Sequence, residues 1–263
     1  MAIKLIASDL DGTLFGADHV PEQRTVDAIN AHAAAGTIIA AVTGRSWFGG
    51  IERATRTGAH LDWFIGSNGG HRVNVASGEL VERLVFDGES LDVWLAAIEA
   101  EFGAVGFGFE HDDGMSWTPR FYELHPHMLD GGARFDTSAE KSKNSVGKFF
   151  ISNPNCRPED MLDSVRAILP DNIEVTTSGV GSVEVMPECA DKGSALDRLC
   201  TEIGVSQGDV IAFGDNLNDL TMIEWAGRGV AMGNAVAEVH AIADEATATN
   251  VDFGVAQVLE TLL

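Results

Sequence analysis

The sequence predicts an α/β protein in which a doubly wound, Rossmann-like parallel sheet is interrupted by an inserted α+β domain. Three observations predict this fold class. Short apolar runs alternate with helical patterns near both ends of the chain, adjacent strand patterns replace that alternation in the middle, and the 263-residue length exceeds the usual size of one domain. We therefore expect a core of residues 1–85 plus 187–263 and an inserted domain of residues 86–186.

The first part of the core follows the order strand, helix, strand. Apolar spacing predicts a helix from Pro21 to Ala35, with Pro21 near its first turn and Gly36 at the C′ position. Because a helix separates consecutive strands, these strands should pair in parallel. Their sequences are IKLIAS, TIIAAV and DWFIGS.

The second part of the core resumes the same alternation. A helix is expected where apolar side chains share one face, at Leu196, Leu199, Cys200 and Ile203. After it we expect the strand DVIAFGD, the helix NLNDLTMIEWAG, the strand GVAM and a C-terminal helix. The return of this pattern is the reason to treat the middle of the chain as an insertion.

The inserted domain should combine an antiparallel sheet with helices. Apolar residues spaced i, i+4, i+7 and i+11 from Leu91 to Phe102 mark one helix, and a second lies between Pro158 and Pro170. Residues 119–144 show no clear period, so a long loop is expected there. The expected strands lie in AVGFGFEHDDGMSWT, with a turn at residues 112–114, in VGKFFIS, and in the hairpin IEVTTSGVGSVEVMP.

The charge balance limits the classes of partner. Asp and Glu number 40 against 17 Lys and Arg, which gives a formal net charge of −23 without a long acidic block. Such a surface repels nucleic acids and anionic membranes, so neither is an expected partner. An anionic substrate would need a strong local positive site, such as a metal ion.

Targeting signals and a disulfide pattern are both missing from the sequence. The N-terminal stretch has no apolar region followed by a cleavage site, and no apolar run approaches ~18 residues. Cys156, Cys189 and Cys200 are odd in number and form no CxxC motif, which suits a reducing compartment. We expect a cytoplasmic protein that is a monomer or a homodimer.

Polar residues follow four of the predicted core strands. Ligands of open parallel sheets bind beyond the carboxyl ends of the strands, so these residues are expected to meet in one site. They are Asp9 and Asp11; Thr43, Gly44 and Arg45; Ser67, Asn68, Gly69 and Gly70; and Asp215, Asn216, Asn218 and Asp219.

The residue types at this edge suit phosphoryl transfer. One aspartate can attack phosphorus, while a second carboxylic acid protonates the leaving oxygen and later activates water. Crowded carboxylates need a cation, and Mg²⁺ is commonly held by one or two carboxylates together with a substrate phosphate. Preorganised donors for the phosphoryl oxygens could be Thr43, Lys192 and the loop amides after Asp9.

Six stretches in order carry a resemblance to a known family. They are DLDGTL at 9–14, VTGR at 42–45, SNGG at 67–70, DKGSAL at 191–196, GDNLND at 214–219 and GVAMGNA at 229–235. With them the chain resembles the haloacid dehalogenase superfamily, and within it the Cof-type, sugar-phosphatase-like branch with a C2B-type α/β cap. The third stretch reads SNGG where SNGA is expected, which should alter backbone freedom more than chemistry.

The resemblance implies a Mg²⁺-dependent phosphatase that hydrolyses a small phosphorylated metabolite through an aspartyl-phosphate intermediate. The insert would be its cap. The resemblance implies a role for each motif residue: Asp9 as nucleophile, Asp11 as general acid/base, Thr43, Gly44, Lys192 and Asn218 as phosphate-binding residues, Asp9, Asp215 and the Asp11 carbonyl as metal ligands, and Asp219 as the residue that orients Lys192 or metal-bound water.

Several alternatives stay open. A phosphomutase of the phosphomannomutase type has a related core and cap, and a phospho-accepting receiver-like protein also places carboxylates, Thr and Lys on a parallel sheet. Arg45 has either a structural role or a contact with substrate. The aromatic residues near Arg120 either pack or line a substrate pocket. Among the histidines of the insert, surface or polar-core roles are favoured over metal ligation for His111, His125 and His127.

Overall fold

The computed structural model describes residues 3–16, 18–111, 114–126, 146–177 and 181–263. Its chain divides into two compact units. The core unit comprises Met1–Glu82 with Asp191–Leu263, and the inserted unit comprises Arg83–Ala190. The insert of 86–186 expected from the sequence lies inside the second of these units. Each unit is described separately below.

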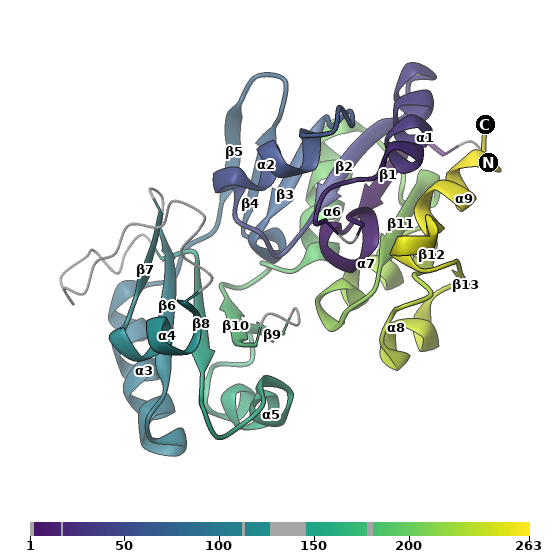
Figure 1. Ribbon diagram of the computed structural model, residues 1–263. Coiled ribbons are helices and arrows are strands. Elements are labelled where there is room, and N and C mark those ends of the chain that lie inside the picture. The colour runs from purple at the N-terminus through teal and green to yellow at the C-terminus, as the bar shows by residue number, and fades with distance from the viewer. Residues whose placement is uncertain (1–2, 17, 112–113, 127–145, 178–180) are drawn as a thin grey trace. The chain divides into compact units, whose positions relative to one another are not determined.

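One eight-stranded sheet forms the centre of the core unit, in the order β13-β12-β11-β1-β2-β3-β4-β5 (Figure 1). All pairs from β13 to β3 are parallel, and β4 runs antiparallel to β3. The predicted doubly wound sheet is therefore confirmed, with an antiparallel addition at one edge. Its strands are β1 (Leu5–Ser8), β2 (Ile38–Val42), β3 (Trp63–Gly66), β4 (His71–Asn74), β5 (Glu79–Arg83), β11 (Val210–Gly214), β12 (Arg228–Ala231) and β13 (Glu245–Ala246).

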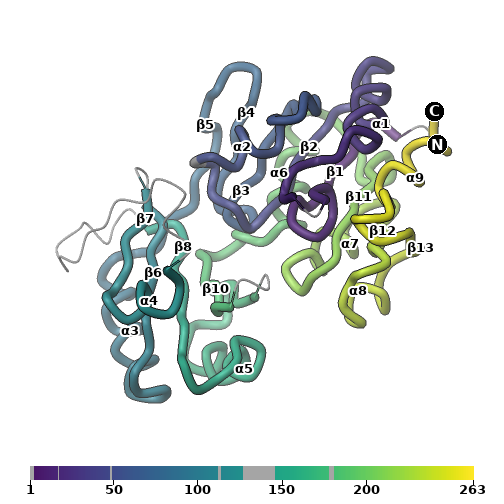
Figure 2. Tube along the Cα trace, in the orientation of Figure 1, coloured from purple at the N-terminus to yellow at the C-terminus, as the bar shows by residue number. Residues whose placement is uncertain are grey.

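Strand β1 lies between β2 and β11, as the chain trace also shows (Figure 2). Leu5 is in register with Ile38 on one side and with Val210 on the other. Since every side chain of β1 is buried, alternate residues face two separate cores. The carboxyl end of β1 therefore lies near the middle of the sheet, between β2 and β11.

Helices cover both faces of the core sheet. Ile29, Val255 and Leu259 pack with Ile6 on one face, and Leu196 packs with Leu5 on the other. The helices are α1 (Gln23–Ala34), α2 (Trp47–Thr55), α6 (Lys192–Ile203), α7 (Leu220–Trp225), α8 (Ala237–Ile242) and α9 (Gly254–Glu260). None of the helices in the described part of the chain has the length and apolar character needed to cross a membrane.

The first predicted helix is confirmed with a later start. Helix α1 begins at Gln23, and Pro21 instead forms an isolated β-bridge with Phe15. At the other end, Ala35 is the C-cap and Gly36 has a φ of +93°. A left-handed residue at C′ is the conformation for which glycine is favoured.

The inserted unit contains a five-stranded sheet in the order β7-β6-β8-β10-β9, with antiparallel pairing throughout its described strands. The strands of both predicted hairpins pair as expected, while residues 112–113 of the first turn and 178–180 of the second connection lie outside the described residues. The strands are β6 (Gly106–His111), β7 (Gly114–Trp117), β8 (Lys148–Ser152), β9 (Glu174–Thr176) and β10 (Val183–Met186), and the helices are α3 (Gly88–Phe102), α4 (Pro119–Leu124) and α5 (Pro158–Ile168).

The expectation of a loop over 119–144 is wrong for its first residues. Helix α4 occupies Pro119–Leu124, because the Thr118 side chain accepts a hydrogen bond from Phe121 N and proline opens the first turn. Phe121 is 1% exposed and stacks on Trp117 with ring centroids 4.9 Å apart. Packing thus holds a helix that is too short to show a period. Residues 127–144 lie outside the described residues.

The histidines of the insert have polar-core roles where they are described. His111 Nε2 hydrogen bonds to Ser116 Oγ at 2.8 Å, and His125 Nε2 to Ser152 Oγ at 2.6 Å. Both imidazoles are buried, which agrees with the prediction. His127 lies outside the described residues.

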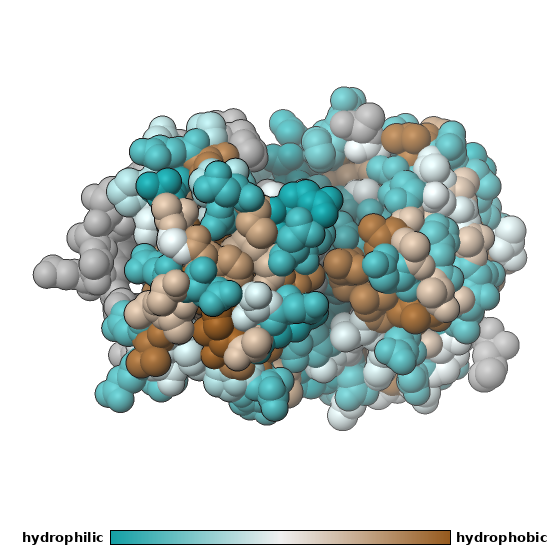
Figure 3. Space-filling model, turned by 90° about the horizontal axis from the view of Figure 1, so that it is seen from below, coloured by the Kyte–Doolittle hydropathy of each residue, from teal (hydrophilic) through white to brown (hydrophobic). Residues whose placement is uncertain are grey.

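On the face shown in Figure 3, hydrophilic residues surround separate hydrophobic patches.

Helices α6 and α7 approach closely at Gly193, directly after Lys192. A Cβ atom on Gly193 would lie 2.4 Å from the backbone oxygen of Thr221, and Gly193 N donates to Thr221 Oγ1 at 3.1 Å. Only a residue without a side chain allows this contact, so Gly193 fixes the depth at which the start of α6 is buried.

We expect Gly193→Ala to lower the free energy of unfolding by about 1–3 kcal/mol, because the added methyl group must push α6 and α7 apart. Urea denaturation measures this change. The matched control is Gly208→Ala, where a Cβ would meet nothing within 4 Å. Equal stability of the two variants would contradict the close-approach explanation.

Candidate active site

The loop after β1 brings residues 9–13 beside Asp215. Asp9 is the first residue after the strand, and Gly12 takes a φ of +83° within the tight turn Leu10–Leu14. A Cβ on Gly12 would lie 2.4 Å from Asp215 Oδ2, so glycine permits both the backbone conformation and the approach. Thr13 Oγ1 donates to Asp215 Oδ1 at 2.8 Å. The two halves of the core unit are thus joined at this point.

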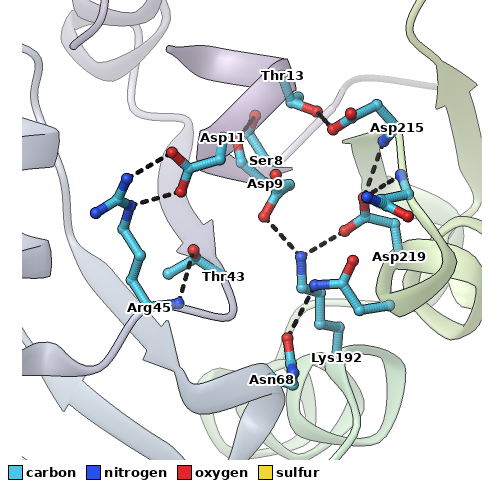
Figure 4. Close-up of polar contacts among 12 residues, drawn as sticks. Ser8, Asp9, Asp11, Thr13, Thr43, Arg45, Asn68, Lys192, Asp215 and Asp219 are labelled. Atoms are coloured by element: carbon cyan, nitrogen blue, oxygen red, sulfur yellow. Dashed lines mark hydrogen bonds and ion pairs between the residues drawn. The ribbon is translucent and has the colours of Figure 1, made fainter. Parts of the chain in front are cut away.

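Lys192 is the centre of the site and is fully buried. Its Nζ donates to Asp9 Oδ1 at 2.6 Å and to Asp219 Oδ1 at 2.5 Å (Figure 4). Burial alone would lower the pKa of Lys192, but Asp219 and Asp9 outweigh it and hold that pKa above its ordinary value. Lys192 is therefore a permanent cation that fixes the orientation of two carboxylates.

Burial and neighbouring carboxylates disfavour the ionised forms of Asp9 and Asp215. Burial raises the pKa of Asp9 well above its ordinary value; Lys192 opposes this rise, and Asp219 and Asp215 add to it. Burial together with Asp219 raises the pKa of Asp215 from 3.8 to about 6. Both shifts have the same cause, because the carboxylates are buried and close to one another.

Asp219 has a supporting position. Its Oδ2 accepts hydrogen bonds from Asp215 N at 2.8 Å and Asn216 N at 2.9 Å, while its Oδ1 is bound to Lys192. Both oxygens are therefore occupied by the chain itself, and the side chain is fully buried. Asp219 therefore fixes the position of the Lys192 ammonium group relative to the loop after β11.

Asp11 lies away from this cluster, with its carboxylate turned toward Arg45 (Figure 4). Arg45 Nε donates to Asp11 Oδ2 at 2.5 Å and Nη2 donates to Oδ1 at 2.6 Å. The guanidinium also lies 5.6 Å from the centroid of the Phe15 ring. Arg45 therefore contacts both oxygens of the Asp11 carboxylate, and His19 Nδ1 lies 3.5 Å from Asp11 Oδ1.

The other predicted phosphate-binding residues surround the same strand ends. Thr43 is 1% exposed, and its Oγ1 accepts a hydrogen bond from Arg45 N at 3.2 Å, so its own proton can point elsewhere. Gly44 lies between these two residues. Asn218 comes from the loop after β11, where its Nδ2 donates to Asn68 Oδ1 at 2.9 Å.

The donor set fits a hard divalent cation. Asp9, Asp215 and Asp219 each offer a carboxylate oxygen within 4.8 Å of the others. Counting Asp11 as well, four carboxylates face two cations, Lys192 and Arg45, which leaves two negative charges when all are ionised. Oxygen ligands and a charge of this size match Mg²⁺.

Four residues of the site were outside the predicted catalytic, phosphate-binding and metal set. Thr13 and Asn68 stand inside the quoted motifs, so motif membership was the available signal. The sequence does not distinguish a structural role of Arg45 from a contact with substrate. Asn234 also stands in a motif, and its Nδ2 donates to the carbonyl of Gly12 at 2.8 Å. Thr13 and Asn234, which contact Asp215 and the nucleophile loop, are the residues that sequence reasoning missed, whereas Arg45 and Asn68 were expected at this edge without an assigned role.

The arrangement defines a hydrolase of the phosphatase class, with its acidic residues at the carboxyl ends of parallel strands. A family model described as haloacid dehalogenase-like hydrolase matches residues 6–259. The chain belongs to this family, as the resemblance of its motifs indicated, and is a phosphatase of its Cof-type branch.

Individual relatives cover nearly the whole chain. The protein YxeH of Bacillus subtilis (strain 168) is 31% identical over 275 residues, covering 99% of this chain and 98% of its own. The HMP-PP phosphatase of Enterobacter sp. (strain 638) is 30% identical over 244 residues, covering 90% of this chain and 86% of its own. A solved haloacid dehalogenase-like hydrolase from B. subtilis superimposes with a TM-score of 0.86 at 25% identity, covering 99% of this chain and 100% of that one.

The raised pKa of Asp215 predicts a pH-dependent stability in protein freed of divalent metal. Because that pKa is about 6 in the folded state and 3.8 ordinarily, the folded state binds more protons between these values. Stability should therefore fall as pH rises from about 4 through 6.

We expect Asp215→Asn to remove this loss, on the order of 1 kcal/mol for a group that is only partly buried. Asparagine keeps an oxygen acceptor for Thr13. Urea unfolding of both proteins in chelator at several pH values gives the difference. Parallel stability curves across this range would contradict the assignment.

Proposed function

We propose that the protein is a Mg²⁺-dependent phosphatase that hydrolyses a small phosphorylated metabolite through an aspartyl phosphate on Asp9. The observation that carries the proposal is the buried Lys192, which orients Asp9 at the end of the central strand and lies 2.6 Å from its Oδ1. A carboxylate with one oxygen held by a cation has its second oxygen available for attack.

The chain's own residues divide the reaction into two steps. In the first, Asp9 attacks phosphorus while the leaving oxygen takes a proton from Asp11. In the second, Asp11 accepts a proton from water, which attacks phosphorus and releases Asp9. Thr43, Gly44, Lys192 and Asn218 donate to the phosphoryl oxygens as charge develops on them. Asp219 keeps Lys192 in place.

Asp11 must leave Arg45 before it can act. Both of its carboxylate oxygens accept hydrogen bonds from Arg45, whereas donation to the leaving oxygen requires the carboxyl group to face the substrate. We propose that binding of a phosphate ester, which brings its own negative charge to the guanidinium, weakens this contact and frees the carboxylate.

The metal would be held by Asp9 and Asp215, with the carbonyl of Asp11 as a third ligand. Asp219 is the less suitable ligand, because its two oxygens already accept hydrogen bonds. When bound, Mg²⁺ supplies positive charge that offsets the crowded carboxylates and the phosphate. The two uncompensated charges of the residues support a divalent ion.

The substrate is proposed to be a phosphomonoester of a small molecule such as a sugar. The relative named for HMP-PP supports a small phosphorylated compound, and the −23 net charge of this chain disfavours polyanions. The inserted unit, as a cap, would select the leaving group and exclude water. Release of inorganic phosphate, as opposed to an isomerised sugar phosphate, separates this proposal from a phosphomutase.

We expect Asp9→Asn to lower turnover of p-nitrophenyl phosphate by at least about 10³-fold, because the amide cannot act as nucleophile. The matched control is Asp27→Asn on the exposed face of α1, which should keep full activity. Rapid quenching of the wild type and peptide mass spectrometry should find the phosphoryl group on Asp9. A label on Asp11, or an active Asp9→Asn, would exchange or remove the assigned roles.

Metal binding should stabilise the folded protein. At a Mg²⁺ concentration 100 times its Kd, the free energy of unfolding should rise by about 2.7 kcal/mol, since the unfolded chain does not hold the ligands together. Asp215→Asn should lose most of this increase, and Asp27→Asn should keep it. Thermal unfolding with and without Mg²⁺ measures the effect, and an equal rise in both variants would rule out Asp215 as a ligand.

A further inference from the structure

A strained turn follows strand β3 inside the core unit. Ser67, Asn68 and Gly69 have φ values of +51°, +56° and +104°. The first two are not glycine, and their exposures are 0% and 1%. Left-handed residues other than glycine cost free energy, so surrounding contacts must hold this turn in place.

The turn is bonded to the segment that carries Thr43. Asn68 N donates to the carbonyl of Thr43 and Ser67 N donates to the carbonyl of Arg45, both at 2.9 Å. The backbone of the turn therefore fixes the end of β2, where the proposed phosphate-binding hydroxyl is located. A shift of the turn would move Thr43 with it.

The turn also contacts the start of helix α6. A Cβ on Gly69 would lie 2.3 Å from the backbone oxygen of Asp191, so the two backbones touch. Asp191 is the N-cap of this helix and accepts a hydrogen bond from Ser194 N at 2.9 Å. Lys192 is the next residue. The turn therefore packs against the backbone of the residue that precedes Lys192.

The side chain of Asn68 connects the turn to the loop after β11. Its Oδ1 accepts a hydrogen bond from Asn218 Nδ2 at 2.9 Å. An asparagine at this position tolerates the left-handed backbone and presents an amide oxygen in one direction. The third segment that carries a proposed phosphate-binding group is therefore held by the same turn.

We propose that Asn68 is a positioning residue that holds Asn218 toward the phosphoryl group of the substrate, while its turn sets the spacing of Asn218, Thr43 and Lys192. The proposal rests on the proposed phosphatase function. Asn68 acts through Asn218, because the amide oxygen of Asn68 fixes which way the Asn218 amide faces. Small displacements of such groups have large effects on rate.

The competing explanation is that Asn68 serves only the backbone. Asparagine is the residue other than glycine that most readily accepts a left-handed φ, so the turn alone could require it. Glycine separates the two explanations. Asn68→Gly keeps and eases the backbone conformation but removes the amide oxygen, whereas a backbone role would be fully served by glycine.

The test compares Asn68→Gly, Asn218→Ala and the double variant with the wild type. We expect Asn68→Gly to lower kcat/KM for p-nitrophenyl phosphate about tenfold and to weaken binding of inorganic phosphate, measured by calorimetry with Mg²⁺ present. Its Tm should not fall. In the Asn218→Ala background, adding Asn68→Gly should cause little further loss, because the partner through which Asn68 acts is gone.

The matched control is Cys189→Gly, at an exposed residue with a φ of +61°. Glycine at this position likewise relieves a left-handed φ, and kcat/KM for p-nitrophenyl phosphate should stay unchanged. Unchanged kcat/KM and phosphate affinity in Asn68→Gly would overturn the proposal, as would a full tenfold loss in the Asn218→Ala background. Failure of the phosphatase proposal looks different, because the wild type itself would then lack turnover or Asp9→Asn would keep it.

Discussion

The burial of one ammonium group determines how this site is built. Lys192 has no exposed surface, and removing it from water is tolerable only because Asp9 and Asp219 lie within hydrogen-bond distance. Those carboxylates come from the ends of β1 and β11, which are adjacent in the sheet. The strand order, the close approach at Gly193 and the hydrogen bonds of Asp219 all serve to keep three charges at fixed positions.

The same constraint explains the distribution of charge around the site. Lys192 is shared between two carboxylates, so Asp215 is left with a hydroxyl partner, and Asp11 with a cation from another loop. Each acidic residue therefore has a different environment although all four lie at strand ends. Environment, more than residue type, distinguishes the proposed nucleophile from the proposed acid and from the metal ligand.

Much of the core could be predicted from the sequence because its signals are local. The strands are short apolar runs that end at Asp9, Thr43 or Asp215, and parallel pairing follows from the helices between them. The family motifs then identified the residues that the structure brings to one edge of the sheet. Lys192 and Asp9, which belong to two of these motifs, are in contact at 2.6 Å.

The features that were missed depend on contacts between distant segments. Strands β4 and β5 lack a strong apolar run; β4 pairs with β3, and β5 pairs with β4 at the sheet edge. Helix α4 exists because Phe121 packs on Trp117, which no periodicity reveals. Likewise, the contact of Asp11 with Arg45 and the contact of Asn218 with Asn68 depend on where side chains from separate segments meet.

The pairing of β1 with β11 also governs the order in which the chain can fold. Val210, the register partner of Leu5, lies about 200 residues further along the sequence. At a synthesis rate of roughly 5–20 residues per second, β11 is made roughly 10–40 seconds after β1. During that time the edge of β1 that pairs with β11 has no partner strand. All the strands of the inserted unit's sheet are made before β11, so that sheet can form while the core is still incomplete. The insertion therefore makes the acidic site one of the last parts of the protein to assemble.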